Sequence, residues 1–343
     1  MQRVFHVPSH LSYVSKLAGD TFVPVPSPSG EPLRVSDLLT LRSWDFFDVL
    51  HLHTVELATS GDLAALAARL RETDKGFIFT LHDLVPNIEV DTTAFDEKTR
   101  LAAREAPRVV TLTHAAARQV SARFGVTPSV IPHGYAVSPD LMTQRDDGSR
   151  GLLVFGALRP NRDLLGLVRA WRQLPASRLP FRVLLRSLGA SDQQRYAAEL
   201  AELDEAARIE PDLMVETTAG VLSPSELVDK CRQATVLVMP YRSIAHSGQL
   251  ELARDLGLTA VVPDTPTVRA QLSETAAYKH PCVWFPMAAL NNPIEFAGYL
   301  EKASEIPNSQ IESRRDFAQY RSREHETLIG QYRVEYNLSC EQR

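Results

Sequence analysis

The chain alternates along most of its length between short runs of β-branched or aromatic residues and longer stretches whose apolar side chains follow helical spacing. Such alternation is typical of successive βαβ units, in which the strands form a parallel sheet and the helices cover its faces. The chain has 343 residues, which is more than one hydrophobic core usually spans. The sequence therefore predicts an α/β protein with two Rossmann-like parallel-sheet domains.

The first domain is expected over residues 1–140. A stretch that loses all periodicity and collects turn-forming residues, Ala136–Arg150, is interpreted as a linker. The strands expected before it are Arg3–Val7, Val49–His53, Phe77–Thr80, Val109–Thr113 and Ser129–Ile131, and the helices are Asp62–Glu72, Glu97–Arg104 and Ala115–Phe124.

The second domain is expected over residues 151–310. Its strands are Leu152–Phe155, Arg182–Arg186, Met214–Glu216, Val236–Met239 and Ala260–Val262, and its helices are Leu164–Leu174, Asp192–Ala207, Ser223–Gln233 and Gly248–Leu256. The remaining residues, 311–343, are polar and helical in pattern, and we expect this tail to pack back on the first domain.

The composition argues against several classes of protein. The net charge is −5 at pH 7, so no overall positive field favours nucleic acid or anionic lipid as a partner. No segment has the roughly 18 consecutive apolar residues of a membrane span, and the N-terminus lacks the apolar core of a secretory signal. Three cysteines without a Cys-x-x-Cys pair suit a reducing compartment. We therefore expect a cytoplasmic protein without an integral membrane segment.

A buried apolar strand runs directly into His82 and Asp83. Functional groups of α/β proteins gather at the carboxyl ends of central strands, where a histidine can exchange protons or donate to a sugar oxygen. Asp83 could orient His82 or cap the next helix. The alternative interpretation is a histidine that satisfies local backbone groups.

Two further histidines, His51 and His53, alternate along an expected strand and therefore point to one face of its sheet. Such a pair could bind a metal, but the sequence places no third ligand. Roles as buried hydrogen-bonding groups are therefore favoured, and no metal site is predicted. Glu56 lies closer to the following loop, where it could contact a polar acceptor.

The second domain opens with a strand that ends at Gly156 and is followed by Arg159 and Arg162. Glycine lets backbone approach a ligand closely, and guanidinium groups bind phosphate oxygens in a bidentate manner. The segment fits neither the P-loop nor the dinucleotide glycine pattern, so ATPase and dinucleotide functions lose support. A diphosphate clamp is the favoured hypothesis, and a surface turn with solvated arginines is the alternative.

A hydrophobic strand at Val236–Met239 leads to Tyr241 and Arg242, after which Ser247 and Gly248 begin a helix. The unpaired N–H groups and the dipole of a helix start favour an anion. Ser247 could alternatively serve only as the N-cap of that helix.

Five motifs follow one another along the chain between about residues 49 and 264. They are Thr80-Leu81-His82-Asp83, Val130-Ile131-Pro132-His133-Gly134-Tyr135, Phe155-Gly156-x-x-Arg159-Pro160-x-Arg162, Pro240-Tyr241-Arg242-x-Ile244-x-x-Ser247-Gly248 and Gly257-x-x-x-Val261-Val262. This ordered set resembles the GT-B glycosyltransferases of the retaining, family-4-like group, in its subset with a Tyr-Arg and Ser-Gly signature. The resemblance implies an acceptor-binding first domain and a nucleotide-sugar-binding second domain that face a central cleft.

The resemblance also implies roles for particular residues. His82 would lie beside the transferred sugar as the catalytic candidate. The donor diphosphate would be bound by Arg159, Arg162, Ser247 and Gly248, with Gly156, Tyr241, Arg242, Gln249 and Glu251 as further donor-binding candidates. The acceptor-side candidates are Glu56, Asp83 and His133, together with His10, which is a candidate only by its position after the first strand.

This chain departs from the family pattern at two places. Two glutamates usually flank the helix that begins at Gly248, but their positions hold Ile244 and Leu252, and Glu251 is displaced by one residue. The loop after the first strand also lacks the glycine-rich turn of many relatives, so the acceptor contacts there are not carried over.

The implied function is a retaining glycosyltransferase that moves a sugar from a UDP- or GDP-sugar to a hydroxyl of a small molecule or a glycan, in natural-product or glycan biosynthesis. Because the chain contains no Asp-x-Asp, the arginines would stabilise the leaving diphosphate without a metal, and no cofactor is expected. Two alternatives stay open. One is a nucleotide-sugar epimerase of the same fold, and the other is a catalytically silent partner protein that retains the fold.

Overall fold

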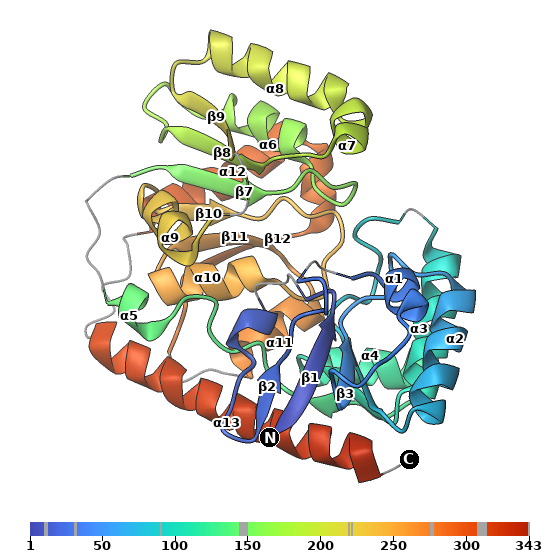
Figure 1. Ribbon diagram of the computed structural model, residues 1–343. Helices are drawn as coiled ribbons and strands as arrows, with labels where there is room; N and C mark the ends of the chain where they lie inside the picture. Colours follow the sequence, from blue (N-terminus) through green and yellow to red (C-terminus); the bar gives the residue numbers. More distant parts are fainter. Residues whose placement is uncertain are drawn as a thin grey trace. The chain divides into compact units, whose positions relative to one another are not determined.

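The computed structural model describes residues 1–9, 13–30, 33–89, 91–143, 150–218, 220, 222–274, 278–306 and 314–341. The chain divides into two compact units (Figure 1). Unit 1 comprises Met1–Ala136, Pro266–Glu274 and Arg323–Arg343, and unit 2 comprises Val137–Thr265 and Thr275–Ser322.

The described part of unit 1 is built on a six-stranded parallel sheet with strand order β2-β1-β3-β4-β5-β6. Every residue of the central strands β3 and β4 is buried, as expected for a parallel sheet covered on both faces. The strands are β1 (Gln2–Val7), β2 (Phe22–Pro24), β3 (Val49–Leu52), β4 (Gly76–Leu81), β5 (Arg108–Thr111) and β6 (Ser129–Val130).

The helices of unit 1 begin and end at residues suited to those positions. Thr59 and Asp91 cap two of them by accepting backbone N–H groups of the first turn. Gly125 ends another with a φ of 73°, the left-handed conformation that glycine adopts without strain. These elements are η1 (Val14–Lys16), α1 (Val35–Thr40), α2 (Ser60–Glu72), α3 (Thr92–Glu105), α4 (His114–Phe124), α11 (Pro266–Ser273) and the second part of α13 (Arg314–Glu341).

Unit 2 has its own six-stranded parallel sheet among the described residues, with order β12-β11-β10-β7-β8-β9. Counted within the unit, this is the order 3-2-1-4-5-6 of a doubly wound fold. The strands are β7 (Leu152–Gly156), β8 (Phe181–Arg186), β9 (Leu213–Thr218), β10 (Val236–Val238), β11 (Thr259–Pro263) and β12 (Cys282–Phe285).

The helices of unit 2 connect these strands, and α12 packs against α6 and β12 (Figure 1). The α9 helix begins with a capping box in which Ser223 and Glu226 exchange hydrogen bonds. The remaining elements are α5 (Pro139–Met142), α6 (Leu164–Trp171), α7 (Ala190–Arg195), α8 (Ala197–Ile209), α9 (Pro224–Arg232), α10 (Gly248–Leu256), η2 (Met287–Asn291) and α12 (Pro293–Glu305), followed by the first part of α13.

Each unit has a core of its own. In unit 1, Tyr332 and Tyr336 of α13 are fully buried against Val4 and Phe22 of the sheet. In unit 2, Trp171 of α6 is fully buried in a cluster formed by the sheet and α12. Burial of a large aromatic side chain removes more apolar area from water than burial of any aliphatic one.

The predicted fold class is confirmed, because both units are α/β with all-parallel sheets. The helix expected over Asp192–Ala207 is instead two helices that break at Tyr196. The strands β2 and β12 and the helix α11 had no counterpart in the sequence analysis. Among the described segments, none of the helices combines the length and apolar character needed to cross a bilayer.

Candidate functional site

Strand order marks one position in unit 2 as the expected ligand site. In an open parallel sheet, ligands bind beyond the carboxyl ends of the strands where the strand order reverses. This reversal lies between β7 and β10, which are hydrogen-bonded neighbours. The residues that follow these two strands include Gly156, Arg162 and Tyr241.

Gly156, at the end of β7, has a φ of 121°, a conformation that side-chain-bearing residues rarely adopt. A Cβ atom at this position would lie 2.8 Å from Nη1 of Arg162 and 3.2 Å from Nε2 of Gln249. The glycine is therefore required both by its backbone angle and by the two side chains that close over it. The sequence analysis interpreted Gly156 as a place where the backbone approaches a ligand closely. In the structure, the groups that lie this close to Gly156 are the side chains of Arg162 and Gln249.

Arg162 is buried and supports this turn from within unit 2. Its Nη2 donates to the Phe155 carbonyl at 2.7 Å, and its Nη1 donates to the Ala157 carbonyl at 3.0 Å. The guanidinium also lies 5.2 Å from the ring centre of Tyr241. Burial lowers the pKa of Arg162 from its usual value. Its donors are thus directed at the protein backbone.

Arg159 has a different environment from Arg162. Its side chain is exposed, and it makes no hydrogen bond or ion pair with any residue that the structure describes. Its charge acts on buried Arg162, whose pKa it lowers further. Of the two arginines in this motif, Arg159 is therefore the one whose guanidinium is available to an anion.

The α10 helix begins beside this turn. Ser247 caps it by accepting the N–H of Leu250 at 3.4 Å, while Gln249 donates to the Phe155 carbonyl at 2.7 Å. Gly248 is exposed at the first helical position. Because the first-turn N–H groups of an α-helix have no partner within it, Gly248 presents a backbone donor and a positive dipole end.

Two further donor-side candidates have their charges engaged elsewhere in unit 2. Arg242 forms an ion pair with Asp163 and donates to Oδ1 of Asn291 at 2.8 Å. Glu251 is 2% exposed, and its carboxylate accepts from Nη2 of Arg321 at 2.7 Å. The structure therefore gathers Gly156, Arg162, Tyr241 and Gln249 around one turn and directs the Glu251 carboxylate into a buried ion pair.

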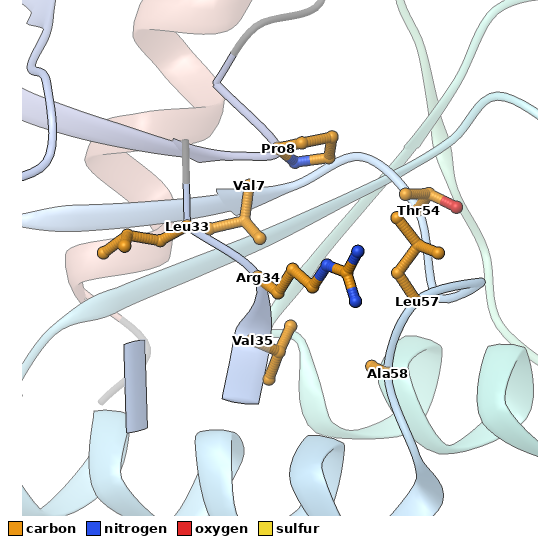
Figure 2. A pocket seen from close by; sticks show the side chains of 8 residues that line it. All are labelled: Val7, Pro8, Leu33, Arg34, Val35, Thr54, Leu57 and Ala58. Atoms are coloured by element: carbon orange, nitrogen blue, oxygen red, sulfur yellow. The ribbon is translucent and has the colours of Figure 1, made fainter. Parts of the chain in front are cut away.

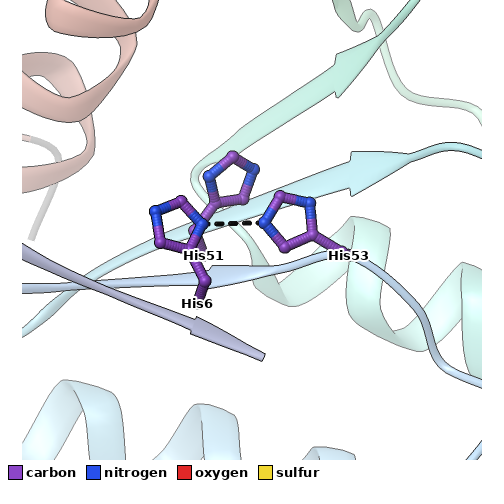
Figure 3. Close-up of side chains that lie close together, drawn as sticks. All are labelled: His6, His51 and His53. Atoms are coloured by element: carbon purple, nitrogen blue, oxygen red, sulfur yellow. Dashed lines mark hydrogen bonds between the residues drawn. The ribbon is translucent and has the colours of Figure 1, made fainter. Parts of the chain in front are cut away.

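In unit 1, His82 immediately follows β4 and heads a chain of hydrogen-bonded imidazoles. Nε2 of His82 lies 3.0 Å from Nδ1 of His53, and Nε2 of His53 lies 2.8 Å from Nδ1 of His6. Figure 3 shows His6 and His53 joined in this way, with His51 beside them. His6 lies on β1 opposite His51 on β3, which explains why these side chains share one face.

Burial keeps these histidines neutral. Desolvation lowers the pKa of His6 to about 3 and holds the pKa of His51 and of His53 well below the usual value. His51 is held on both sides, by the hydroxyl of Thr80 at 2.7 Å and that of Tyr336 at 2.9 Å. Nε2 of His6 has no hydrogen-bond partner among the described residues.

The three histidines His6, His51 and His53 could each offer one nitrogen to a metal, with these atoms within 4.8 Å of one another. Their ring nitrogens already form a hydrogen-bonded network, except for Nε2 of His6. Binding a metal would require several of these hydrogen bonds to break, so the network favours hydrogen-bonding roles for this group.

Tyr13 connects His82 with a second part of the predicted acceptor side. Its ring centre lies 4.8 Å from that of His82 and 4.9 Å from that of His133. Lys16 donates to the carbonyl of Tyr135 at 2.6 Å and lies 3.0 Å from Nδ1 of His133. The structure thus brings both His82 and His133 against one buried tyrosine.

The other acceptor-side candidates are placed differently. Oε1 of Glu56 accepts the backbone N–H groups of Asn87, Ile88 and Glu89 at 2.9, 2.6 and 2.9 Å. That carboxylate therefore fixes the loop that follows His82. Asp83 is half-buried in the same loop. His10 lies outside the described residues.

The sequence analysis missed His6, the third member of the histidine chain. His6 lies in the first expected strand, but its proximity to His51 follows only from the pairing of β1 with β3, which the sequence did not reveal. It also missed Tyr13, which comes just after the first strand and whose hydroxyl lies 2.6 Å from that of Tyr332, far along the chain.

Comparison with solved structures identifies the fold. The chain is similar to HepE from Anabaena in a crystal structure with UDP, at 12% identity, with 97% of this chain and 99% of that chain covered and a TM-score of 0.63. It is similar to an α,α-trehalose 6-phosphate synthase from Burkholderia multivorans, at 16% identity, with 88% of this chain and 74% of that chain covered and a TM-score of 0.60. It is also similar to TarM, at 13% identity, with 84% of this chain and 54% of that chain covered and a TM-score of 0.55. The fold is therefore that of the GT-B glycosyltransferases.

One part of the sequence matches a family model. Residues 7–138 match the model of the family described as Glycosyltransferase Family 4. Together with the solved structures, this match confirms the predicted resemblance to this group and the predicted class of enzyme, a glycosyltransferase. No curated protein sequence shows a significant match to the chain.

Proposed function

We propose that the protein is a retaining, metal-independent glycosyltransferase that moves a sugar from a UDP-sugar to a hydroxyl acceptor in glycan or natural-product biosynthesis. The turn after β7 carries this proposal. It places Arg159, exposed and without a partner among the described residues, on a backbone fixed by Arg162 and Gln249, at the reversal in strand order where ligands of such sheets bind. Unit 2 would thus bind the donor diphosphate.

The leaving group explains why a cation and helix amides suit this position. As the sugar–phosphate bond breaks, negative charge grows on the departing diphosphate, and fixed donors stabilise it more in the transition state than in the ground state. Arg159 would supply a bidentate guanidinium, and Gly248 would supply an N–H group at the positive end of α10. Arg162 would hold the turn in place and not contact phosphate itself.

The choice of nucleotide rests on a structural relative. HepE from Anabaena is a protein of the same fold in complex with UDP, and a further structure of it contains UDP-glucose. This supports UDP over GDP as the nucleotide of the donor, and it leaves the transferred sugar to experiment.

His82 would act in unit 1 as a hydrogen-bond donor to the transferred sugar. Its Nε2 lies 3.0 Å from Nδ1 of His53, so the buried histidine holds the ring of His82 at the end of β4. Retention of anomeric configuration is supported by the match to Glycosyltransferase Family 4. Independence from a divalent metal is supported by the absence of Asp-x-Asp from the sequence and by the exposed guanidinium of Arg159 at the turn.

A transfer assay tests the proposal. UDP-glucose, UDP-galactose and UDP-N-acetylglucosamine would each be incubated with the protein, EDTA and a panel of hydroxyl acceptors, and the products followed by proton NMR. We expect a glycoside with the α-anomeric configuration of the donor. A β-glycoside would contradict retention, and activity restored only by a divalent cation would contradict metal independence. An epimerised sugar nucleotide formed without acceptor would support the epimerase alternative instead.

A further inference from the structure

A cavity of about 300 Å³ opens in unit 1 beyond the ends of β1 and β3 (Figure 2). Val7 and Pro8 lie at the end of β1, and Thr54 and Leu57 follow β3. The remaining described lining comes from the segment that leads into α1, together with Ala58. A volume of this size suits a small molecule.

The cavity lies where a parallel sheet is expected to bind a ligand. The strand order of unit 1 is β2-β1-β3-β4-β5-β6, so the chain leaves β1 towards β2 on one side and later continues at β3 on the other. The order therefore reverses between β1 and β3, and parallel sheets bind ligands beyond the carboxyl ends of the strands at this reversal. The cavity is lined by the residues that follow these two strands.

The lining is apolar with one cation. Leu57 is 48% exposed, so it presents apolar surface at this cavity. Arg34 is the charged side chain among the described lining residues, and its guanidinium makes no hydrogen bond or ion pair with any residue that the structure describes. Figure 2 shows that guanidinium extending towards Leu57.

We propose that this cavity binds the acceptor and that the acceptor has an apolar body with one anionic group, which pairs with Arg34. The proposal deepens the proposed function, because it names the class of acceptor for the same transfer. An apolar body would cover Leu57 and Leu33 and remove their exposed surfaces from water. A carboxylate or phosphate would form a charge-assisted pair with the Arg34 guanidinium.

The same lining disfavours a sugar as acceptor in this cavity. Besides Arg34, the polar side chain among the described lining residues is Thr54, whose hydroxyl already accepts the backbone N–H of Glu56 at 3.2 Å. A sugar would exchange several hydrogen bonds with water for a largely apolar wall, which is unfavourable. The cavity would therefore select an acceptor by its apolar contacts with the lining and by the charge of Arg34.

Isothermal titration with three probes tests this inference. para-Coumarate has an aromatic body, a hydroxyl and a carboxylate; its methyl ester lacks only the charge; and glucuronate has the charge without the apolar body. We expect para-coumarate to bind at least about ten-fold more tightly than its ester. This ratio corresponds to a difference of ~1.4 kcal/mol in binding free energy. Glucuronate should bind most weakly.

Two substitutions locate the binding. Arg34→Gln should make para-coumarate and its ester bind equally, whereas Leu57→Ser should weaken both by a similar factor. Arg118→Gln, an exposed arginine on α4 outside the cavity lining, is the matched control and should change neither affinity. Both test residues are exposed, so neither substitution disturbs buried packing.

Three results would overturn the inference. They are an absence of para-coumarate binding, equal affinities of wild type for the acid and its ester, and an effect of Arg34→Gln no larger than that of Arg118→Gln. A UDP titration of the same proteins reports on the proposed function separately. If UDP failed to bind while para-coumarate bound through Arg34, the donor assignment would fail and the cavity would stand.

Discussion

Nδ1 of His53 lies 3.0 Å from Nε2 of His82, so the residue that follows β4 is held by a histidine that follows β3. His53 is held in turn by His6, whose remaining nitrogen, Nε2, has no partner among the described residues. A buried N–H without an acceptor is rarer in proteins than a buried acceptor without a donor. The proton of His6 is therefore expected on Nδ1, and each histidine then donates to the next.

This direction of donation makes a prediction about tautomers. His6 and His53 should both be protonated on Nδ1, and His82, which then accepts at Nε2, should carry its own proton on Nδ1. Long-range proton–nitrogen correlation spectra of histidine-labelled protein report the protonated nitrogen directly. Protonation of His53 on Nε2 would contradict this arrangement.

A substitution of His53 gives a functional check. His53→Leu should lower kcat about ten-fold or more and leave the UDP affinity unchanged, whereas His114→Gln, at an exposed position on α4, should alter neither kcat nor the UDP affinity.

The stability of the protein should depend on pH through the same histidines. His6 has a pKa of about 3 in the folded protein and about 6.5 as a free side chain, so the unfolded chain takes up its proton first as pH falls. The contribution of His6 to the free energy of unfolding should therefore be level above pH 6.5 and fall below it. His6→Gln should remove up to about 1.4 kcal/mol per pH unit from this slope. Denaturant titrations at several pH values measure it, and equal slopes for the two proteins would contradict the burial of a neutral His6.

Gly156 should not tolerate a side chain. Gly156→Ala combines a φ of 121° with a Cβ only 2.8 Å from Nη1 of Arg162, so we expect a loss of about 2 kcal/mol in the free energy of unfolding and weaker UDP binding. Gly189→Ala is the control, because its Cβ would meet no atom within 4 Å, and it should stay within ~0.5 kcal/mol of wild type. Similar stabilities of the two variants in urea would refute this interpretation.

Glu251 is predicted to stabilise the fold without binding the donor. Its carboxylate pairs with Arg321 in a buried site, so Glu251→Gln should lower the free energy of unfolding by about 3 kcal/mol. Glu202→Gln removes an exposed ion pair with Arg169 and should lower it by less than about 1 kcal/mol. The UDP affinity of folded Glu251→Gln, measured by titration calorimetry, should equal that of wild type. A marked loss of affinity would restore Glu251 to the donor site.

Local patterns were sufficient to predict the strands of both sheets that are central and apolar throughout. They were insufficient for β2, which is three residues long and includes a proline, and for β12, whose pairing with β11 is non-local. The helix break at Tyr196 also had no local signal, because neither proline nor glycine occurs there. Such features depend on contacts that a single segment does not encode.

In the candidate site, too, features set by neighbouring residues could be predicted and features set by non-local contacts could not. Gly156 and the start of α10 could be predicted, because turn glycines and helix caps are properties of a few neighbouring residues. The inward orientation of Arg162 and the pairing of Glu251 with Arg321, 70 positions away, depend on the assembled unit. Arg162→Ala should therefore destabilise the fold as well as the turn. Losing its bonds to the carbonyls of Phe155 and Ala157 should lower the free energy of unfolding by about 2 kcal/mol.

The central claim is that the turn after β7 binds a uridine diphosphate through Arg159 without a metal. Titration calorimetry of wild type and Arg159→Gln with UDP and GDP, in the presence of EDTA, tests it most directly. We expect wild type to bind UDP more tightly than GDP, and Arg159→Gln to bind UDP about ten-fold more weakly, or ~1.4 kcal/mol, with an unchanged free energy of unfolding. No binding of UDP to wild type, or equal binding by wild type and Arg159→Gln, would contradict the claim.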